Sequence, residues 1–124
     1  MIQDVELNLA PIHVDGDKVI WVLNNLLTNA IKHSPENDNI TISVKPTNNI
    51  ISFTVIDHGN GIEEKYLDQI FERYFQVPGR LDTRGTGIGL AISKDFIEAM
   101  GGKVWVRSKV GQGSTFGFDF PYKV

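Results

Sequence analysis

Apolar and polar residues alternate along this chain with two different periods. Over residues 18–33 the apolar side chains recur at intervals of three and four, which predicts an amphipathic helix with one broad apolar arc. Residues 88–100 repeat this pattern until Gly101 and Gly102 end it, and residues 63–71 predict a shorter helix. We therefore expect about three helices.

Alternation with a period of two occupies the segments between and after these helices. It predicts strands over residues 5–9, 12–14, 40–44, 51–55, 103–108 and 114–120. Residues 45–49 are expected to form a hairpin loop and residues 110–113 a turn. Residues 76–84 have little apolar pattern, so they are expected to form a mobile loop.

Each predicted strand has one apolar face and one more polar face. Phe116, Phe118 and Phe120, for example, share one face of the last strand. An antiparallel sheet can leave one face to water, whereas a doubly wound parallel sheet needs two apolar faces. The pattern therefore predicts an α+β fold, a two-layer sandwich in which helices cover one face of a largely antiparallel sheet.

The composition is that of one globular domain. The 124 residues suffice for a single core, and 41% hydrophobic with 22% charged residues exclude a disordered chain. The net charge of −3 gives no reason to expect nucleic-acid binding, and the absence of cysteine excludes disulfides and cysteine-based metal sites. No apolar run reaches the length of a membrane span, and the N-terminus lacks a signal-peptide pattern.

A glycine-rich stretch, residues 84–92, leads directly into the second long helix. Gly85, Gly87 and Gly89 alternate with larger residues, and glycine lets a ligand approach the backbone closely. The unpaired N–H groups of the helix that follows favour an anion. We interpret the stretch as a phosphate cradle, although its spacing is neither that of the P-loop nor that of the dinucleotide fingerprint. A flexible loop before a helix is the alternative.

A polar stripe borders the apolar arc of the first helix. Asn25, Asn29 and Lys32 follow one another at spacings of four and three, so they lie on one side of the helix. Asparagine is a poor helix former, and its side-chain oxygen suits Mg²⁺, while a lysine can reach a phosphate. The stripe therefore favours the edge of a binding groove; a solvated polar face is the alternative.

The second strand of the first hairpin ends in Asp57, which Gly59 and Gly61 follow closely. A carboxylate there can accept a hydrogen bond from an exocyclic amine such as that of adenine, and the glycines let a base lie against the backbone. An ordinary turn after a strand is the alternative.

Aromatic residues gather in residues 71–75, next to the predicted mobile loop. They could hold a lid over a nucleotide or simply pin the loop to the core, and by residue type alone we favour the pin. Arg73, Arg80 and Arg84 flank this region and are candidates to contact a terminal phosphate.

Five motifs follow one another in a specific order. They are residues 25–32 (NLLTNAIK), 57–62 (DHGNGI), 70–75 (IFERYF), 85–92 (GTGIGLAI) and 111–116 (GQGSTF). They resemble the asparagine box, the first glycine box, the phenylalanine box and the second and third glycine boxes of the catalytic ATP-binding domain of sensor histidine kinases. That domain belongs to the GHKL ATPase superfamily, and the resemblance covers residues 15–121.

The resemblance implies a mixed, mostly antiparallel sheet and a site for ATP and Mg²⁺. The residues that it implies for nucleotide binding are Asn25, Asn29, Lys32, His33, Asp57, Gly59, Gly61, Ile62, Tyr74, Phe75, Gly85, Thr86, Gly87, Ile88, Gly89, Leu90 and Thr115. The implied catalytic residues are Asn29, Lys32, Arg73 and Arg84. The implied Mg²⁺ ligands are Asn29 and, beside it, Asn25.

Individual roles follow from the same resemblance. Asp57 reads the adenine, Gly59 and Gly61 shape the base pocket, and Thr115 reaches the adenine through water. Residues 71–85 form the lid over the nucleotide. The alternating glycines of the second glycine box hold the phosphates, with Leu90 packed near the nucleotide.

Two positions depart from the family pattern. His33 stands where many relatives carry an aromatic residue, and it could reach a phosphate or end the helix. Gln76 stands where a basic residue is frequent, so the partner of the γ-phosphate could be Arg73, Arg80 or Arg84.

The resemblance also implies phosphoryl transfer in place of hydrolysis. Hydrolysing relatives, such as DNA gyrase and the large heat-shock chaperone, carry a general-base glutamate at the position of Asn25, and an amide cannot take a proton near neutral pH. The phosphoryl acceptor is then a histidine on a separate dimerisation domain, and a response regulator follows downstream. A nucleotide-binding module without activity, a GHKL ATPase and an anti-sigma kinase are the alternatives.

Residues 1–124 are expected to be one catalytic and ATP-binding domain without the dimerisation domain. An acceptor histidine is typically followed by an acidic residue and an arginine, and His13, His33 and His58 do not fit that pattern. The isolated domain is therefore not expected to phosphorylate itself. We expect a cytoplasmic domain without contact to nucleic acid or membrane, although most parent kinases of this kind are membrane-bound.

Overall fold

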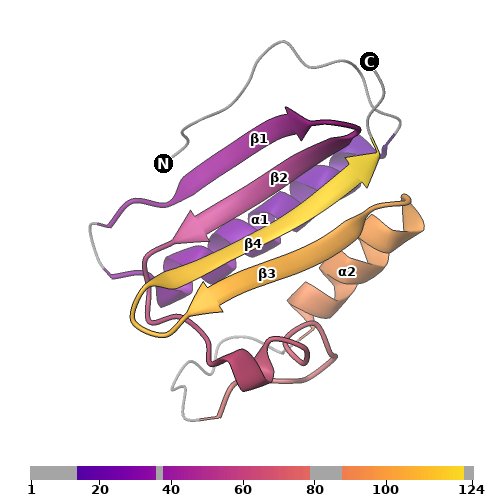
Figure 1. Cartoon of the computed structure of the whole chain (residues 1–124). Coiled ribbons are helices and arrows are strands. Elements are labelled where there is room, and N and C mark those ends of the chain that lie inside the picture. Colours follow the sequence, from indigo (N-terminus) through magenta and orange to yellow (C-terminus); the bar gives the residue numbers. More distant parts are fainter. Residues whose placement is uncertain (1–13, 36–37, 79–87, 122–124) are drawn as a thin grey trace.

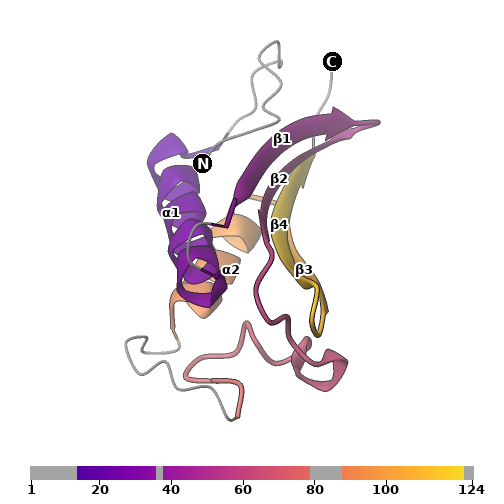
Figure 2. The same cartoon turned by 90° about the vertical axis from the view of Figure 1, so that its left-hand side faces the viewer.

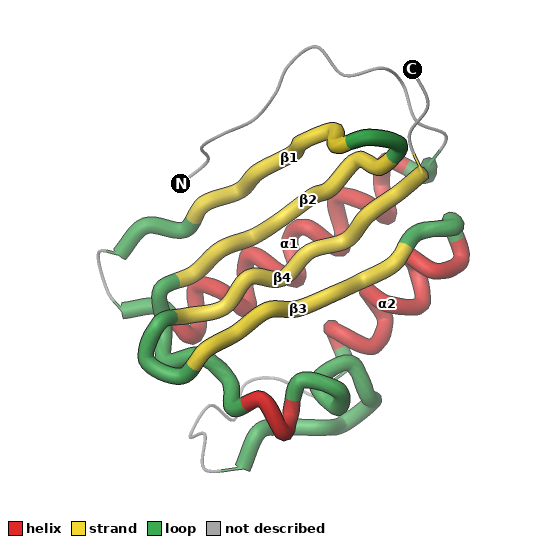
Figure 3. Tube along the Cα trace, viewed as in Figure 1, coloured by secondary structure: helices red, strands yellow, loops and turns green. Residues whose placement is uncertain are grey.

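The computed structural model describes residues 14–35, 38–78 and 88–121 of the chain. Its elements in chain order are α1 (Gly16–His33), β1 (Thr41–Thr47), β2 (Ile50–Asp57), the 3-10 helix η1 (Glu64–Tyr66), α2 (Gly89–Ala99), β3 (Lys103–Lys109) and β4 (Gly113–Pro121). Figures 1 and 3 show a sheet with two α-helices packed on it. None of the helices in these ranges combines the length and the apolar composition that a membrane span needs.

The two ends of α1 are fixed by local sequence. The side chain of Asp15 caps the helix, because it accepts hydrogen bonds from the backbone N–H groups of Asp17 and Lys18 at 3.1 and 3.3 Å. Ser34 is extended, as expected for the residue before Pro35, so the helix stops there. The buried residues of the apolar arc are Val19, Val22, Leu26 and Ala30.

The four described strands form one sheet in the order β1-β2-β4-β3. Neighbouring strands are antiparallel, and β2 pairs with β4 in the centre of the sheet. The parallel pairing that a mixed sheet requires does not occur in this described part of the chain. Each predicted hairpin is present, and the two hairpins join along β2 and β4.

The hydrophobic core lies between the sheet and the helices. Figure 2 shows α1 and α2 on the same side of the curved sheet. The fully buried side chains that the sheet contributes are Ile51, Val55, Phe116, Phe118 and Phe120. Phe53 stacks on Phe118 with the ring centroids 4.8 Å apart. The predicted α+β two-layer sandwich is therefore confirmed, as is the shared face of the three phenylalanines in β4.

Trp105, Arg107 and Asp119 alternate with the core residues, so they lie on the opposite face of the sheet. The indole of Trp105 lies across Gly117, where a Cβ would collide with the ring. Its N–H donates a hydrogen bond to Asp119 at 2.9 Å, and the guanidinium of Arg107 lies 5.0 Å from the ring centroid. Gly117 is thus required by the close approach of the indole to the strand.

Two predicted elements have different bounds in the structure. The helix expected over residues 63–71 is wrong in length: it is a single 3-10 turn followed by further turns. Ile70 is buried there and Phe71 packs against the core, so tertiary contacts hold a segment that is too short to be a stable helix. The loop expected over residues 45–49 is also shorter, because β1 continues to Thr47 and Asn48 turns the chain with a φ of 53°.

Other predictions fall partly on residues that the structure does not describe. The strand predicted over residues 5–9 lies outside the described residues, as does that over residues 12–14 except for Val14, which forms a bend. Most of the loop predicted over residues 76–84 lies outside them too. The predicted end of the second long helix is confirmed, because α2 stops before Gly101, which has a φ of +85°.

Candidate functional site

A polar stripe runs along α1 beside the core. Asn25, Asn29 and His33 are spaced by four residues, so they lie above one another on one side of the helix, and Lys32 adjoins them. All four side chains are half-buried. At about 1.5 Å per residue, the stripe from Asn25 to His33 is about 12 Å long.

The Asn25 end of the stripe lies against the start of α2. A Cβ on Gly89 would collide with the side-chain oxygen of Asn25, so any larger residue would displace that amide. The two helices run antiparallel, because Trp21 packs edge-on against Phe96 at 5.1 Å, one turn before Asn25 along α1. The asparagine motif and the glycine-rich motif are therefore in direct contact, as a shared site requires.

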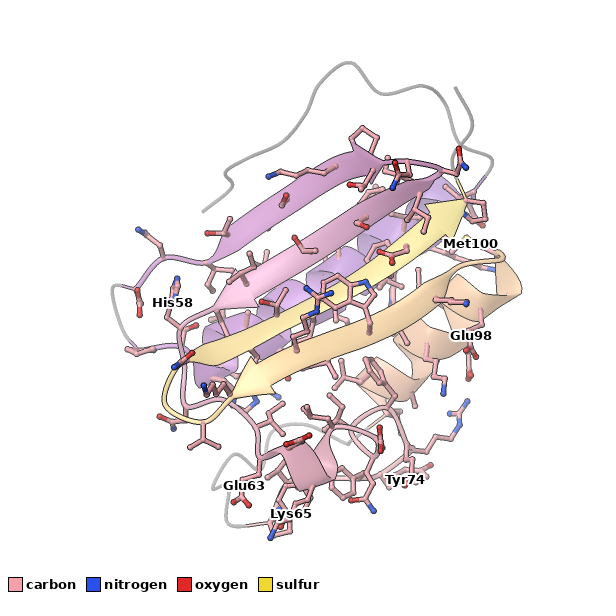
Figure 4. The ribbon with its side chains drawn as sticks, in the orientation of Figure 1. His58, Glu63, Lys65, Tyr74, Glu98 and Met100 are labelled. Carbon is pink, nitrogen blue, oxygen red and sulfur yellow. The ribbon has the colours of Figure 1, made fainter. Side chains whose placement is uncertain are left out.

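The second end of the stripe meets the loop that follows β2. A Cβ on Gly59 would collide with the backbone carbonyl of His33. The N–H of Gly59 donates a hydrogen bond of 2.9 Å to the carboxylate of Asp57, and only 3% of Asp57 is exposed. His58, between them, is exposed at the end of β2 (Figure 4). The buried carboxylate is thus placed beside the C-terminal end of α1.

The turn between β3 and β4 packs against the same loop. Gly61 has a φ of +76°, and a Cβ there would collide with the carbonyl of Lys109. The N–H of Gly111 donates to the carbonyl of Asn60 at 2.9 Å. Both glycines at positions 59 and 61 are buried. Close backbone packing explains why these positions cannot carry a side chain.

The start of β4 corrects one of the predicted site residues. Ser114 pairs with Asp57, whereas Thr115 pairs with Ile56 and Arg107. Because side chains alternate along a strand, Thr115 lies on the face of the sheet away from the helices. Ser114, which the sequence analysis did not single out, shares the helix-covered face with Asp57. The third glycine box contains both residues, and the alternation that Ser114 shares with Phe116 selects Ser114.

The aromatic residues of segment 71–75 differ in their contacts. The rings of Phe71 and Phe75 pack against the core, which supports the interpretation of this segment as a hydrophobic pin. Tyr74 is 74% exposed with a φ of 64° (Figure 4). The guanidinium of Arg73 donates to the carboxylate of Asp95 at 2.7 Å, so it is engaged by α2.

The structure describes only some of the remaining predicted residues. Ile88 and Leu90 are half-buried where α2 begins, and Leu90 packs against the core. Arg80, Arg84, Gly85, Thr86 and Gly87 lie outside the described residues. Ile62, at the end of the loop after β2, is buried.

Within the described residues, no cluster of three or more histidine, aspartate or glutamate side chains could hold a metal ion. A divalent cation here would therefore take amide oxygens of the α1 stripe together with oxygens of a ligand and water, which is the usual arrangement for Mg²⁺. On η1, Tyr66 and then Glu63 raise the pKa of the exposed Lys65 above its ordinary value.

Comparison with known proteins identifies relatives along the whole described chain. A family model described as histidine kinase-, DNA gyrase B-, and HSP90-like ATPase matches residues 14–124. The chain is 39% identical over 117 residues to the sensor histidine kinase WalK of Bacillus subtilis (strain 168), covering 90% of this chain and 19% of that protein. It is 37% identical over 120 residues to the adaptive-response sensory kinase SasA of Gloeothece citriformis (strain PCC 7424), covering 96% and 30%.

A solved structure shares the fold. Full-length ShkA in complex with AMPPNP superposes with a TM-score of 0.84 at 31% identity, over 99% of this chain and 26% of that chain. The chain thus spans less than a third of the length of these three relatives.

Proposed function

The chain belongs to the histidine kinase-, DNA gyrase B- and HSP90-like ATPase family, and we propose that it binds Mg-ATP and donates the γ-phosphoryl group to a histidine on a separate dimerisation domain. In this proposal it is the catalytic domain of a two-component sensor kinase that acts in the cytoplasm and passes the phosphoryl group on to a response regulator. The relatives named as sensor kinases, and the AMPPNP in the ShkA complex, support it.

One observation carries the proposal. The α1 stripe touches Gly89 at one end and Gly59 at the other, so three motifs that are far apart in sequence line one continuous path. A nucleotide laid along this path would have its base at Asp57 and its phosphates at Asn25 and the start of α2. Unrelated surface features would not share two such close contacts.

The base would be read at the buried carboxylate. Asp57 accepts one hydrogen bond from Gly59, and a carboxylate has acceptor capacity beyond that bond. The exocyclic amine of adenine donates a hydrogen bond, whereas the corresponding carbonyl of guanine cannot. We assign the second base contact to the hydroxyl of Ser114, in place of Thr115, because Ser114 is the partner of Asp57 in the sheet.

The phosphates would be held at the other end of the stripe. Asn25 and Asn29 present amide oxygens for Mg²⁺. Lys32 and His33 lie one turn beyond Asn29, towards the base end, and the long side chain of Lys32 can extend to a phosphate as a point charge. Bound Mg²⁺ neutralises charge on the phosphates. The backbone N–H groups at the start of α2 add favourable donors for the same anion.

The residues around the phosphates favour transfer over hydrolysis. Asn25 offers an amide where a general base would have to take a proton from water, and an amide has no basic lone pair near neutral pH. Phosphoryl transfer depends mainly on positioning and charge stabilisation, so the nucleophile can come from another domain. The pairing of Arg73 with Asp95 favours a second candidate, a module that binds ATP without transferring it, since this arginine is held away from a phosphate role.

Calorimetry and a labelling assay test the proposal in two steps. Titration with AMPPNP and Mg²⁺ is expected to give saturable one-site binding that weakens without Mg²⁺, with no binding of the guanine analogue. Radiolabelled ATP is then added with a purified dimerisation segment, and acid-labile, base-stable label on that segment indicates transfer. Binding without label supports the second candidate, and absence of binding contradicts both.

A further inference from the structure

Ser108 connects the segments around the candidate base pocket, although it lies in β3 outside all five sequence motifs. Its hydroxyl lies 2.7 Å from the backbone nitrogen of Ile62 and 3.0 Å from the carbonyl oxygen of Gly113. It also lies 2.7 Å from the hydroxyl of Ser114, its partner across the sheet. One side chain thus joins β3, the start of β4 and the end of the loop after β2.

The donors and acceptors assign a direction to each of these bonds. A hydroxyl has one proton to donate and two lone pairs that accept. The carbonyl of Gly113 takes the proton of Ser108, and the N–H of Ile62 occupies one lone pair. The remaining lone pair then accepts the proton of Ser114, which fills the capacity of Ser108 and leaves the oxygen of Ser114 as an acceptor.

These bonds hold the loop after β2, next to the proposed base pocket, at both of its ends. The loop begins after Asp57 and ends at Ile62. Ser114 is the sheet partner of Asp57. Backbone groups supply further contacts between this loop and the turn after β3, among them Gly111 to Asn60 and Gly61 against Lys109. Ser108 makes its contacts to this region through a side chain, so a substitution can remove them without altering the backbone hydrogen bonds.

We propose that Ser108 is a positioning residue for adenine recognition, because it sets the distance between the Asp57 loop and Ser114 and orients the hydroxyl of Ser114. This inference rests on the proposed function of the site. Without the hydroxyl, the N–H of Ile62 and the carbonyl of Gly113 lose a half-buried hydrogen-bond partner, and the loop shifts to find others. The affinity for the base falls, while contacts at the phosphate end stay as they are.

The test compares three variants of Ser108 with a matched control by calorimetry, using ADP and GDP as probes. S108A and S108C remove the hydroxyl, and the cysteine keeps nearly its volume with a much weaker hydrogen-bonding group. S108T keeps the hydroxyl and has a β-branched side chain that suits a strand. The control is S43A, since Ser43 is another serine of the sheet but lies in β1, at the opposite edge.

We expect S108A and S108C to weaken ADP binding about tenfold, or about 1.4 kcal/mol. The preference for ADP over GDP should fall by a similar factor, whereas S108T and S43A stay within about threefold of the unchanged chain in both respects. If S108A does not fold, S108C decides.

Three results would count against the inference about Ser108 or against the proposed function. An unchanged ADP to GDP ratio in S108C, even with a lower melting temperature, shows a purely structural role and overturns the inference. Loss of ADP affinity in S108T equal to that in S108C also overturns it. If the unchanged chain does not bind ADP at all, the proposed function fails and the inference with it.

Discussion

The two ends of the candidate site are held by different kinds of contact. At the base end, Gly59 and Gly61 lie against the backbone carbonyls of His33 and Lys109, and Asp57 is buried in the sheet. At the phosphate end, Gly89 lies against the side chain of Asn25. A backbone carbonyl fixed by secondary structure cannot move far, whereas a side-chain amide can rotate to another rotamer.

Substitutions at the two ends should therefore differ in their effects on stability and on ligand binding. At the base end, one substitution can disturb both the fold and the binding of the base. At the phosphate end, we expect the fold to tolerate change and only the position of the Asn25 amide to be affected. Four substitutions separate these consequences.

The largest effect is expected for Asp57→Asn. An amide oxygen can still accept the N–H of Gly59, so the loop keeps its hydrogen bond and the free energy of unfolding changes by less than about 1 kcal/mol. The amide NH₂, however, cannot accept the amine of adenine, and we expect ADP to bind roughly a hundredfold more weakly, about 3 kcal/mol. Calorimetry and thermal unfolding measure the two quantities. Unchanged ADP affinity contradicts the assignment of the base end.

Next comes Gly59→Ala, which probes the stability of the base end. The added methyl group would meet the carbonyl of His33, so the loop and the end of α1 must separate. We expect the free energy of unfolding to fall by about 2–3 kcal/mol in urea titrations. Gly16→Ala is the control, because nothing lies within 4 Å of its Cβ position. A fall no larger than that of the control shows that the contact is not rigid.

Gly89→Ala probes the phosphate end. The methyl group displaces the amide of Asn25, and alanine favours the helix by up to about 1 kcal/mol, so the melting temperature should hold or rise. We expect Mg-ATP to bind about tenfold more weakly, whereas adenosine, which lacks phosphates, binds as before. Equal losses for both ligands mean that this contact is not specific to the phosphate end.

The smallest effect is expected for Arg73→Ala, which breaks the ion pair with Asp95. Both side chains are more than half exposed, at 54% and 59%, so the pair contributes at most about 1 kcal/mol to the free energy of unfolding. ADP affinity should be unchanged. A double-mutant cycle with Asp95→Ala measures the pair, and a large loss of Mg-ATP affinity in R73A alone would restore a phosphate role for this arginine.

The long periodic elements were predictable from the sequence. The arc of Val19, Val22 and Leu26 and the alternating phenylalanines of β4 each repeat over several turns or residue pairs, which outweighs local propensity. The segment after Glu63 was not predictable in the same way. Its turns are held by single contacts such as the packing of Ile70, which involve residues distant in sequence.

The motifs of the site were predictable from the sequence, but their arrangement in space was not. Asp57, Asn25 and Gly89 were all selected as site residues, yet their order along one path depends on how α1 crosses the end of the sheet. Thr115 was predicted from the motif match alone, although the alternation of the β4 phenylalanines already places Ser114, and not Thr115, on their face of the strand. Ser108 belongs to no motif, and only the folded structure shows its contacts.

In the proposed site, the Asp57 loop and the stripe of Asn25 and Asn29 bind the same molecule. An NMR titration with Mg-AMPPNP tests this most directly, by following the backbone amides of Gly59 and Gly61 and the side-chain amides of both asparagines. We expect all four signals to shift along one saturation curve with a single dissociation constant, while the amide of Gly117 on the opposite face stays in place. Shifts confined to one end, or different dissociation constants at the two ends, would contradict the account.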